Sequence, residues 1–108
     1  MTRRELWGRK DAQTRKCCYC ELDIPRSEVT REHIIPKSKG GKGGLIAPCC
    51  RSCNQQKKDM FLIDFVLLLM KQQGQMKKKK VIKRAEVKIR NATKFLLLLY
   101  PEYDFIFL

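Results

Sequence analysis

The sequence that decides the fold reads CCYC at residues 17–20, TREHIIP at residues 30–36 and PCCRSCNQQKK at residues 48–58. The first and third stretches each contain a C-x-x-C pair, a spacing that occurs nowhere else in the chain: Cys17, Cys20, Cys50 and Cys53. Two such pairs can supply four thiolates, each about 2.3 Å from one tetrahedral zinc ion. A disulfide framework would need an oxidising compartment, to which nothing in the sequence points. Six unrelated free thiols would not form two matched pairs, so the sequence predicts a structural zinc site.

The segment between the cysteine pairs must hold structure of its own. Residues 21–49 separate the pairs, a gap longer than the roughly 15–20 residues of a simple zinc ribbon. Val29 to Ile35 is rich in β-forming residues and predicts a short strand, which Pro36 ends. Four glycines around Lys42 predict a loop, and Leu45 to Ala47 predicts a return strand. Together these elements predict a β-hairpin with a glycine-rich loop.

The three stretches also form one longer pattern. In chain order it reads Cys-x-x-Cys, Thr-x-Glu-His-Ile-Ile-Pro-x-Ser-x-Gly-Gly and Pro-x-Cys-x-x-Cys-Asn-x-x-Lys, which resembles the zinc-containing HNH endonucleases. The resemblance implies an α+β fold with a small ββα-metal (His-Me finger) core and a structural zinc ion. The hairpin would carry Glu32 and His33, and a helix would start near Asn54. The resemblance also implies hydrolysis of DNA phosphodiester bonds with a divalent ion, Mg²⁺ or Mn²⁺.

Glu32, His33 and Asn54 are the candidate catalytic residues. Phosphodiester hydrolysis needs a nucleophile and stabilisation of the charge on the phosphoryl and leaving oxygens. His33 is the only imidazole in the chain, and its ordinary pKa of about 6.5 suits it to take a proton from water. Carboxylate and amide oxygens are hard ligands that suit Mg²⁺. The resemblance therefore makes His33 the general base, and Glu32 and Asn54 the ligands of the catalytic ion.

Each of these assignments has a simpler alternative. Glu32 could be a surface charge, and Asn54 could cap its helix. In a regular strand Glu32 would face away from His33, unless the hairpin end is twisted or bulged. The sequence also departs from the family pattern, because Leu45 stands where the family has an Asn that is thought to orient the histidine loop. Since a leucine side chain cannot hydrogen-bond, either Ser38 or a backbone carbonyl holds His33, or the nuclease is weak or inactive.

The charge of the chain favours nucleic acid as the partner. The chain has 24 Lys and Arg against 11 Asp and Glu, a formal net charge of +13 at pH 7. Each base that meets a phosphate releases a condensed counterion, which favours binding to DNA, duplex or branched. An anionic membrane surface is the weaker alternative, because the basic block at residues 77–94 lacks a lipid-facing stripe. The candidate nucleic-acid contacts within the pattern are Lys37, Lys39, Lys42, Arg51, Lys57 and Lys58.

The whole chain of 108 residues has the length of a single domain. Residues 1–16 predict a basic arm or helix, residues 17–58 the HNH core, and residues 59–108 a helical extension with an apolar tail. One helix is predicted from Gln55 to about Gly74 and a second from about Lys77 to Leu99, packed antiparallel. The tail either closes the helical core or forms a homodimer interface.

The sequence thus favours a zinc-stabilised, divalent-metal-dependent DNA endonuclease with a histidine general base. One alternative is a catalytically weak or inactive HNH-like module that binds nucleic acid or a nucleic-acid-processing complex. Another is a zinc finger that binds protein through its apolar C-terminal half. The chain shows no signal-peptide pattern and no apolar run near the roughly 20 residues of a membrane span. We therefore expect no membrane partner and a non-secreted protein in a reducing compartment, cytoplasmic or associated with nucleic acid.

Overall fold

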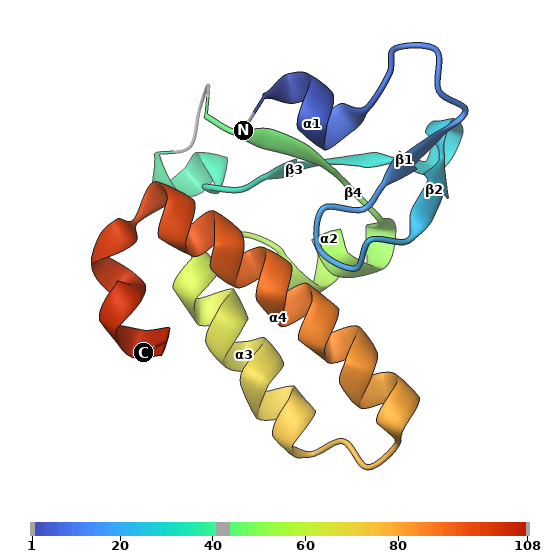
Figure 1. Cartoon of the computed structure of the whole chain (residues 1–108). Helices are drawn as coiled ribbons and strands as arrows, with labels where there is room; N and C mark the ends of the chain where they lie inside the picture. Colours follow the sequence, from blue (N-terminus) through green and yellow to red (C-terminus); the bar gives the residue numbers. More distant parts are fainter. Residues whose placement is uncertain (1, 41–43, 108) are drawn as a thin grey trace.

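The computed structural model describes residues 2–40 and 44–107. In these ranges the elements follow in the order α1 (Arg3–Trp7), β1 (Thr14–Lys16), β2 (Asp23–Pro25), η1 (Arg26–Glu28), β3 (Thr30–His33), η2 (Lys37–Lys39), β4 (Ile46–Cys49), α2 (Arg51–Lys57), α3 (Leu62–Gly74), α4 (Lys79–Leu99) and η3 (Pro101–Phe107), where η marks a 3₁₀ segment (Figure 1). Two small antiparallel sheets and the helices thus form a mixed α+β molecule, as the resemblance implied. Lys42, in the glycine-rich loop, lies outside the described residues.

Two antiparallel hairpins form the N-terminal half of the molecule. β1 pairs with β2, and the first C-x-x-C pair lies in the turn between them. β3 pairs with β4, which places Glu32 opposite Ala47 and His33 opposite Ile46. This second hairpin is the one that the sequence predicted. Its return strand is longer than expected, since β4 extends to Cys49, next to the second cysteine pair.

The helix that follows the second cysteine pair differs from the prediction. We expected one helix from Gln55 to Gly74 with Asn54 near its start, but α2 begins three residues before Asn54, and α3 is a separate helix. Cys50 is the N-cap of α2, and its Sγ accepts a hydrogen bond from the backbone N–H of Cys53 at 3.4 Å. A thiol thus takes the place of the Ser or Asp that usually marks a helix start. α2 ends at Lys57, because the next residue, Lys58, has a φ of 51°, which a helix cannot accommodate.

Helices α3 and α4 form an antiparallel pair that packs beside the hairpins (Figure 1). The sequence predicted α4 from Lys77 to Leu99, and the helix starts two residues later. Each helix buries one apolar face; the buried residues are Leu62, Phe65, Val66 and Leu69 on α3, and Ala85, Ala92, Phe95 and Leu96 on α4.

Tyr19, between the first two zinc-candidate cysteines, joins the hairpins to the helices. Its ring is fully buried and meets Phe65 and Phe95 edge-on, with ring centroids 5.1 and 6.0 Å apart. Edge-to-face pairs of this kind add about 0.5–1.5 kcal/mol to the burial of the rings. The side chain of Asn91 on α4 donates to the carbonyl oxygen of Tyr19 at 2.7 Å. The cysteine turn and the helical pair therefore share one core.

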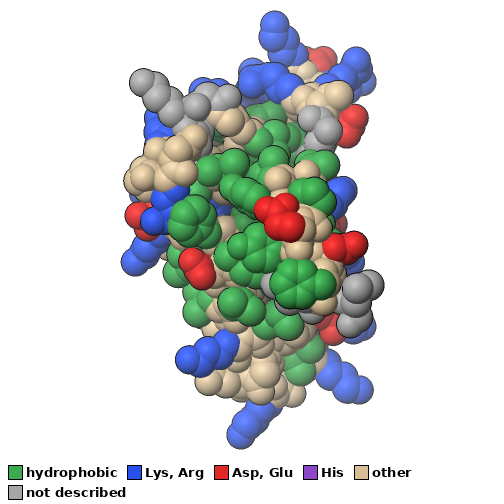
Figure 2. Space-filling model, turned by 90° about the vertical axis from the view of Figure 1, so that its left-hand side faces the viewer, with side chains coloured by type: hydrophobic (Ala, Val, Ile, Leu, Met, Phe, Trp, Pro, Cys, Tyr) green, Lys and Arg blue, Asp and Glu red, His purple; other side chains and the backbone are tan. Residues whose placement is uncertain are grey.

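The C-terminal segment η3 lies beside the end of α4. The rings of Tyr100 and Tyr103 are edge-on with centroids 6.2 Å apart, and both residues pack against the core. Phe105 instead is 70% exposed. Figure 2, which views the side of the molecule that carries η3, shows a broad apolar face there. The tail thus contributes to the core and also leaves apolar surface uncovered.

At the other end of the chain, the segment expected to be an arm or a helix forms the short helix α1 and a loop that leads into β1. The indole N–H of Trp7 donates to the carbonyl oxygen of Ile46 at 3.1 Å, which fixes α1 on β4. Among the described residues, no helix combines the length and the apolar character needed to cross a membrane.

Candidate metal centre and active site

The four cysteines of the C-x-x-C pairs form one cluster. Their Sγ atoms all lie within 4.8 Å of one another. Cys17 and Cys20 come from the turn between β1 and β2, whereas Cys50 and Cys53 come from the start of α2. The Sγ atoms of Cys20 and Cys50 are 3.8 Å apart, about the separation expected for two sulfurs bound to one tetrahedral zinc ion. The donor set and its spacing fit structural zinc, as the sequence predicted.

Backbone amides support negative charge on these sulfurs. The N–H of Cys50 donates to Sγ of Cys17 at 3.4 Å, in the same way as the N–H of Cys53 donates to Sγ of Cys50. Hydrogen bonds from the thiols of Cys18 and Cys20 lower the pKa of Cys17, whereas the hydrogen bond to Cys17 raises the pKa of Cys20 to about 11. One thiolate therefore opposes ionisation of its neighbour. Four thiolates at this distance need a cation among them.

Cys18 and Cys49 lie beside the cluster without belonging to it. Cys49 is fully buried in the core, and Cys18 is half-buried. The backbone N–H of Cys18 donates to the carbonyl oxygen of Pro48 at 2.8 Å, which ties the first cysteine turn to β4. Both residues thus contribute to packing around the cluster.

Glu32, His33 and Asn54 line one surface hollow of about 390 Å³, where the end of β3, the η2 turn and α2 meet. The hollow is otherwise lined by Arg31, Pro36, Lys37, Ser38, Lys58 and Asp59. His33 and Asn54 are partly exposed, whereas Glu32 is buried. The structure therefore brings the three candidate catalytic residues to one place.

Glu32 lies on the inner face of β3. Neighbouring residues of a strand point to opposite sides, so Glu32 faces the core when His33 faces the surface. Only 2% of Glu32 is exposed. Its Oε2 accepts a hydrogen bond from the Tyr19 hydroxyl at 2.8 Å and lies 3.3 Å from Nζ of Lys57. Burial raises the pKa of Glu32, and the Lys57 ammonium opposes that rise. The carboxylate is thus held by two partners, and Oε1 is the oxygen that it can offer to a cation.

Asn54 is fixed in one orientation by a chain of hydrogen bonds. The Thr30 hydroxyl donates its single hydrogen to the carbonyl oxygen of Cys49 at 2.7 Å. The Asn54 atom that faces this hydroxyl at 2.9 Å must therefore be the donor, Nδ2. The carbonyl oxygen of the Asn54 amide is then the atom available to a cation.

His33 is anchored by its backbone rather than by its ring. Nζ of Lys57 donates to the carbonyl oxygen of His33 at 3.3 Å. Within residues 2–40 and 44–107, the imidazole has no hydrogen-bond partner. Desolvation lowers the pKa of His33, and the positive charges of Lys37, Arg31 and Lys57 lower it further. The ring is therefore neutral at neutral pH, the form that a general base requires.

Leu45 does not replace the missing family Asn. Its carbonyl oxygen accepts a hydrogen bond from the backbone N–H of Ile34 at 3.1 Å, a contact that any residue can make. Ser38, which the sequence offered as an alternative support for His33, lines the same hollow as His33.

The candidate phosphate contacts are divided among different places. Lys37 and Lys58 are exposed and line the His33 hollow. Nζ of Lys39 lies 4.9 Å from the ring centroid of Phe61, and exposed Arg51 borders a different hollow. Lys57 is fully buried against Glu32. A buried ammonium cannot reach a phosphate, so the prediction of Lys57 as a nucleic-acid contact is wrong.

Sequence reasoning missed Arg31, which lines the His33 hollow. The alternation of side chains along β3 could have revealed it, because Arg31 and His33 are two residues apart and face the same side. Asp59 was also missed; it follows the break after α2, which the sequence did not predict.

Part of the chain matches a known protein family. Residues 17–66 match the family model described as HNH endonuclease. No curated protein and no solved structure matches the chain. The matched segment contains the four-cysteine cluster and every residue that lines the His33 hollow. The segment from residue 17 to residue 66 is therefore similar to the HNH endonucleases, as the sequence pattern indicated.

Proposed function

We propose that this protein is a zinc-stabilised endonuclease that hydrolyses phosphodiester bonds of DNA with a divalent ion and a histidine general base. The observation that carries the proposal is the common hollow of His33, Glu32 and Asn54 beside the four-cysteine cluster. The match of residues 17–66 to the HNH endonucleases supports a nuclease-like module. The net charge of +13 supports DNA as the substrate.

The cysteine cluster has a structural task in this proposal. Cys17 and Cys20 belong to the first hairpin, and Cys50 and Cys53 belong to α2. A zinc ion bound to all four would hold α2 against the hairpins, and with it Asn54. The cluster has no open ligand position for a substrate, because four sulfurs already complete a tetrahedron. Zinc therefore stabilises the fold and takes no part in the chemistry.

Glu32 and Asn54 are the residues that would hold the catalytic ion, Mg²⁺ or Mn²⁺. Asn54 offers its carbonyl oxygen, and Glu32 offers Oε1, because Tyr19 and Lys57 already hold Oε2. When bound, the ion stabilises negative charge on the phosphoryl and leaving oxygens. Two protein ligands suit Mg²⁺, which keeps several of its waters.

His33 takes a proton from the attacking water in this mechanism. Its lowered pKa keeps the imidazole neutral and able to accept the proton at neutral pH. Exposed Lys37 and Lys58 at the rim of the hollow hold the phosphate by charge. Neither lysine reads bases, so these contacts position DNA without selecting a sequence.

Nicking of supercoiled plasmid by the purified full chain, with and without added Mg²⁺, tests the proposal. Wild-type protein nicks only with the divalent ion, and His33→Ala loses at least about 100-fold in rate because the proton acceptor is gone. His33→Ala must retain DNA binding and zinc content, which shows that the fold persists. Nicking that continues unchanged in His33→Ala would contradict the proposed base.

The second candidate function is a DNA-binding module without cleavage. The absence of a hydrogen-bond partner for the His33 ring within residues 2–40 and 44–107, together with Leu45 at the position of the family Asn, favours it. Leu45→Asn separates the two candidates, with Leu45→Ala as the control for loss of the leucine side chain. A wild-type protein that binds DNA without nicking it, and gains nicking with Leu45→Asn only, would favour the second candidate.

The apolar face of the C-terminal half is the place for a homodimer. The large exposed apolar side chains of this half are, among the described residues, Phe61, Leu67, Met70, Val81, Leu98 and Phe105. Two copies joined there would present two active sites, which suits cleavage of both strands of a duplex. Analytical ultracentrifugation of wild type and Phe105→Ser tests this part. A wild-type protein that is monomeric at every concentration would contradict the dimer and leave the nuclease proposal intact.

A further inference from the structure

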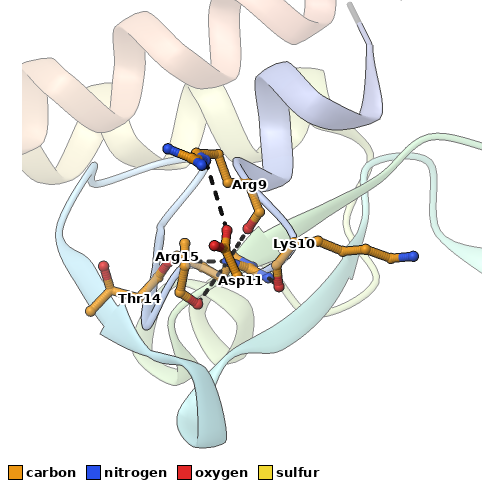
Figure 3. A network of polar contacts seen from close by, with 6 residues as sticks. Arg9, Lys10, Asp11, Thr14 and Arg15 are labelled. Atoms are coloured by element: carbon orange, nitrogen blue, oxygen red, sulfur yellow. Dashed lines mark hydrogen bonds and ion pairs between the residues drawn. The ribbon is translucent and has the colours of Figure 1, made fainter.

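The basic N-terminal segment, residues 2–16, is held in a defined shape by one buried arginine. Figure 3 shows the Arg15 guanidinium inside the loop that joins α1 to β1. Its Nη1 donates to the carbonyl oxygens of Arg9, Ala12 and Thr14 at 3.0, 3.2 and 3.3 Å, and its Nη2 donates to that of Lys10 at 3.4 Å. Arg15 is only 9% exposed. Its guanidinium donates to the carbonyl oxygens of its own loop and is therefore not available to a ligand. The side chains of Arg9 and Lys10, in contrast, are exposed.

Trp7 fixes the other end of this segment. Besides the hydrogen bond from its indole N–H to Ile46, its ring lies under two guanidinium groups. The Cζ atom of Arg3 is 5.5 Å from the ring centroid, and that of Arg31 is 5.8 Å from it. Arg3 belongs to α1 and Arg31 to β3, so the indole brings two separate basic residues to one place. Such stacking orients a guanidinium without neutralising its charge.

The side chains around Trp7 form a basic hollow of about 490 Å³. Its lining residues are Arg3, Arg4, Trp7, Gly8, Arg9, Lys10, Asp11 and Arg15. The one carboxylate among them, Asp11, lies 3.7 Å from Nε of Arg9, with both side chains exposed. A pair so exposed to water contributes little, so Asp11 leaves most of the positive charge of the hollow unbalanced.

Arg31 connects this basic hollow to the candidate active site. It stacks on Trp7 and also lines the His33 hollow. Arg31 and His33 lie on the same, outer face of β3. Positive charge therefore continues from the active site across β3 to α1 and the loop after it.

We propose that Arg3, Arg4, Arg9, Lys10 and Arg31, positioned by Trp7 and Arg15, form a second phosphate-binding surface, which holds the backbone of duplex DNA beyond the scissile phosphate. The inference rests on the proposed function, because it starts from a phosphate bound at His33. It adds the direction in which the DNA leaves the active site, toward α1. In this arrangement Trp7 is a positioning residue and Arg31 a phosphate contact.

Duplex DNA fits this surface better than a single strand. Proteins that bind single strands offer exposed aromatic rings on which bases stack. Trp7 is the aromatic residue of this hollow, and it is partly buried with two guanidinium groups against its ring. The groups left for a ligand are guanidinium and ammonium ions, which contact phosphates.

The test measures binding of the full chain to a short DNA duplex by fluorescence anisotropy at several salt concentrations, without added Mg²⁺. One variant combines Arg3→Gln, Arg4→Gln, Arg9→Gln and Lys10→Gln, all at exposed positions. The matched control changes Lys77–Lys80 to Gln, which removes the same charge from exposed residues at the start of α4. We expect the N-terminal variant to bind at least about tenfold more weakly, with the slope of log K against log salt reduced by about 3. We expect the control to change both much less.

Equal losses in the N-terminal variant and the control would overturn the inference, because they would show that only total charge matters. Unchanged binding and slope in the N-terminal variant would overturn it as well. Arg31→Gln should reduce the slope by about 1, and Trp7→Ala should weaken binding more than Trp7→Phe, which keeps a ring for Arg31. If the N-terminal variant binds duplex DNA like wild-type protein but loses binding to duplex RNA, the assignment of this surface to DNA is wrong.

The nicking assay separates this inference from the proposed function. If wild-type protein does not nick plasmid, and the N-terminal variant loses DNA binding while the Lys77–Lys80 control keeps it, the proposed cleavage is contradicted and the second phosphate-binding surface is supported. If wild-type protein nicks plasmid and the N-terminal variant binds DNA and nicks it like wild type, the second phosphate-binding surface is contradicted and the proposed nuclease activity is supported.

Discussion

The two halves of this molecule are held together by different forces. Residues 14–57 form short strands, one short helix and a cluster of cysteines, with a buried Glu32–Lys57 pair beneath the surface. Residues 62–99 form two helices that meet through apolar side chains. Strands of three or four residues do not fold alone. The first half therefore depends on its four-cysteine cluster, which fits a zinc ion, and on buried polar groups, whereas the second depends on the area of apolar surface that it buries.

Loss of the metal should have the largest effect and should fall on the first half. Cys53→Ser removes one of the four sulfurs of the cluster. Because metal binding of about 10 kcal/mol is part of the folding free energy in such sites, the hairpins should lose their structure. Bound zinc and the unfolding temperature should both fall, with much of the helical circular-dichroism signal retained. Cys18→Ser, outside the cluster, is the control. An equal loss of zinc in both variants would contradict the assignment of the ligands.

Truncation of a core ring should have the next largest effect. Phe65→Ala empties a site that is fully buried between the helices and Tyr19. We expect a loss of about 4 kcal/mol in the free energy of unfolding, measured with urea. Leu67→Ala, at an exposed position on the same helix, should cost less than about 0.5 kcal/mol. Similar losses in the two variants would show that α3 is not buried as described.

Removal of one member of the buried ion pair should cost about 3 kcal/mol. Lys57→Met leaves Glu32 buried with Tyr19 as its remaining partner. The double variant Glu32→Gln/Lys57→Met should recover part of that loss, because no unpaired charge remains. Urea unfolding of the two single variants and the double variant gives the coupling energy. A coupling energy near zero would mean that Lys57 serves only to anchor the His33 carbonyl oxygen.

The exposed contact between the halves should matter least. Arg90 on α4 donates to Oε2 of Glu21 at 3.0 Å, with side chains 65% and 42% exposed. Asn91 donates to the same oxygen at 2.8 Å, and these hydrogen bonds lower the pKa of Glu21. Water screens the pair, so Arg90→Ala should cost no more than about 0.5 kcal/mol. A loss several times larger would mean that the Arg90–Glu21 ion pair stabilises the contact between the halves as strongly as the packing of Tyr19 does.

The sequence predicted those parts of the structure that depend on spacing or periodicity. The two C-x-x-C pairs came together as expected, the β3–β4 hairpin formed with strand ends that differ by one or two residues from the prediction, and α4 starts two residues later than predicted. Each of these follows from a pattern within a few neighbouring residues, or from the fixed geometry of four thiols.

The remaining features depend on contacts between distant residues, which no local pattern reveals. α2 begins where the thiol of Cys50 caps it, whereas the sequence pointed to Asn54, a more usual capping residue, as the place where the helix starts. In the sequence Lys57 cannot be distinguished from the other basic residues. Its burial depends on Glu32, which is distant in the chain and lies beside it in the fold. Likewise, Arg15 belongs to a run of bases, and only the fold of its own loop removes it from the surface.

Cys50 has a consequence that reaches beyond the cluster. The same sulfur belongs to the four-cysteine group and caps the helix that carries Asn54 and Lys57. Without a metal ion at the cluster, α2 would lose the support of its N-cap, and the positions of Asn54 and Lys57 would change with it. In the proposed nuclease, cleavage of DNA would then require zinc as well as the catalytic ion.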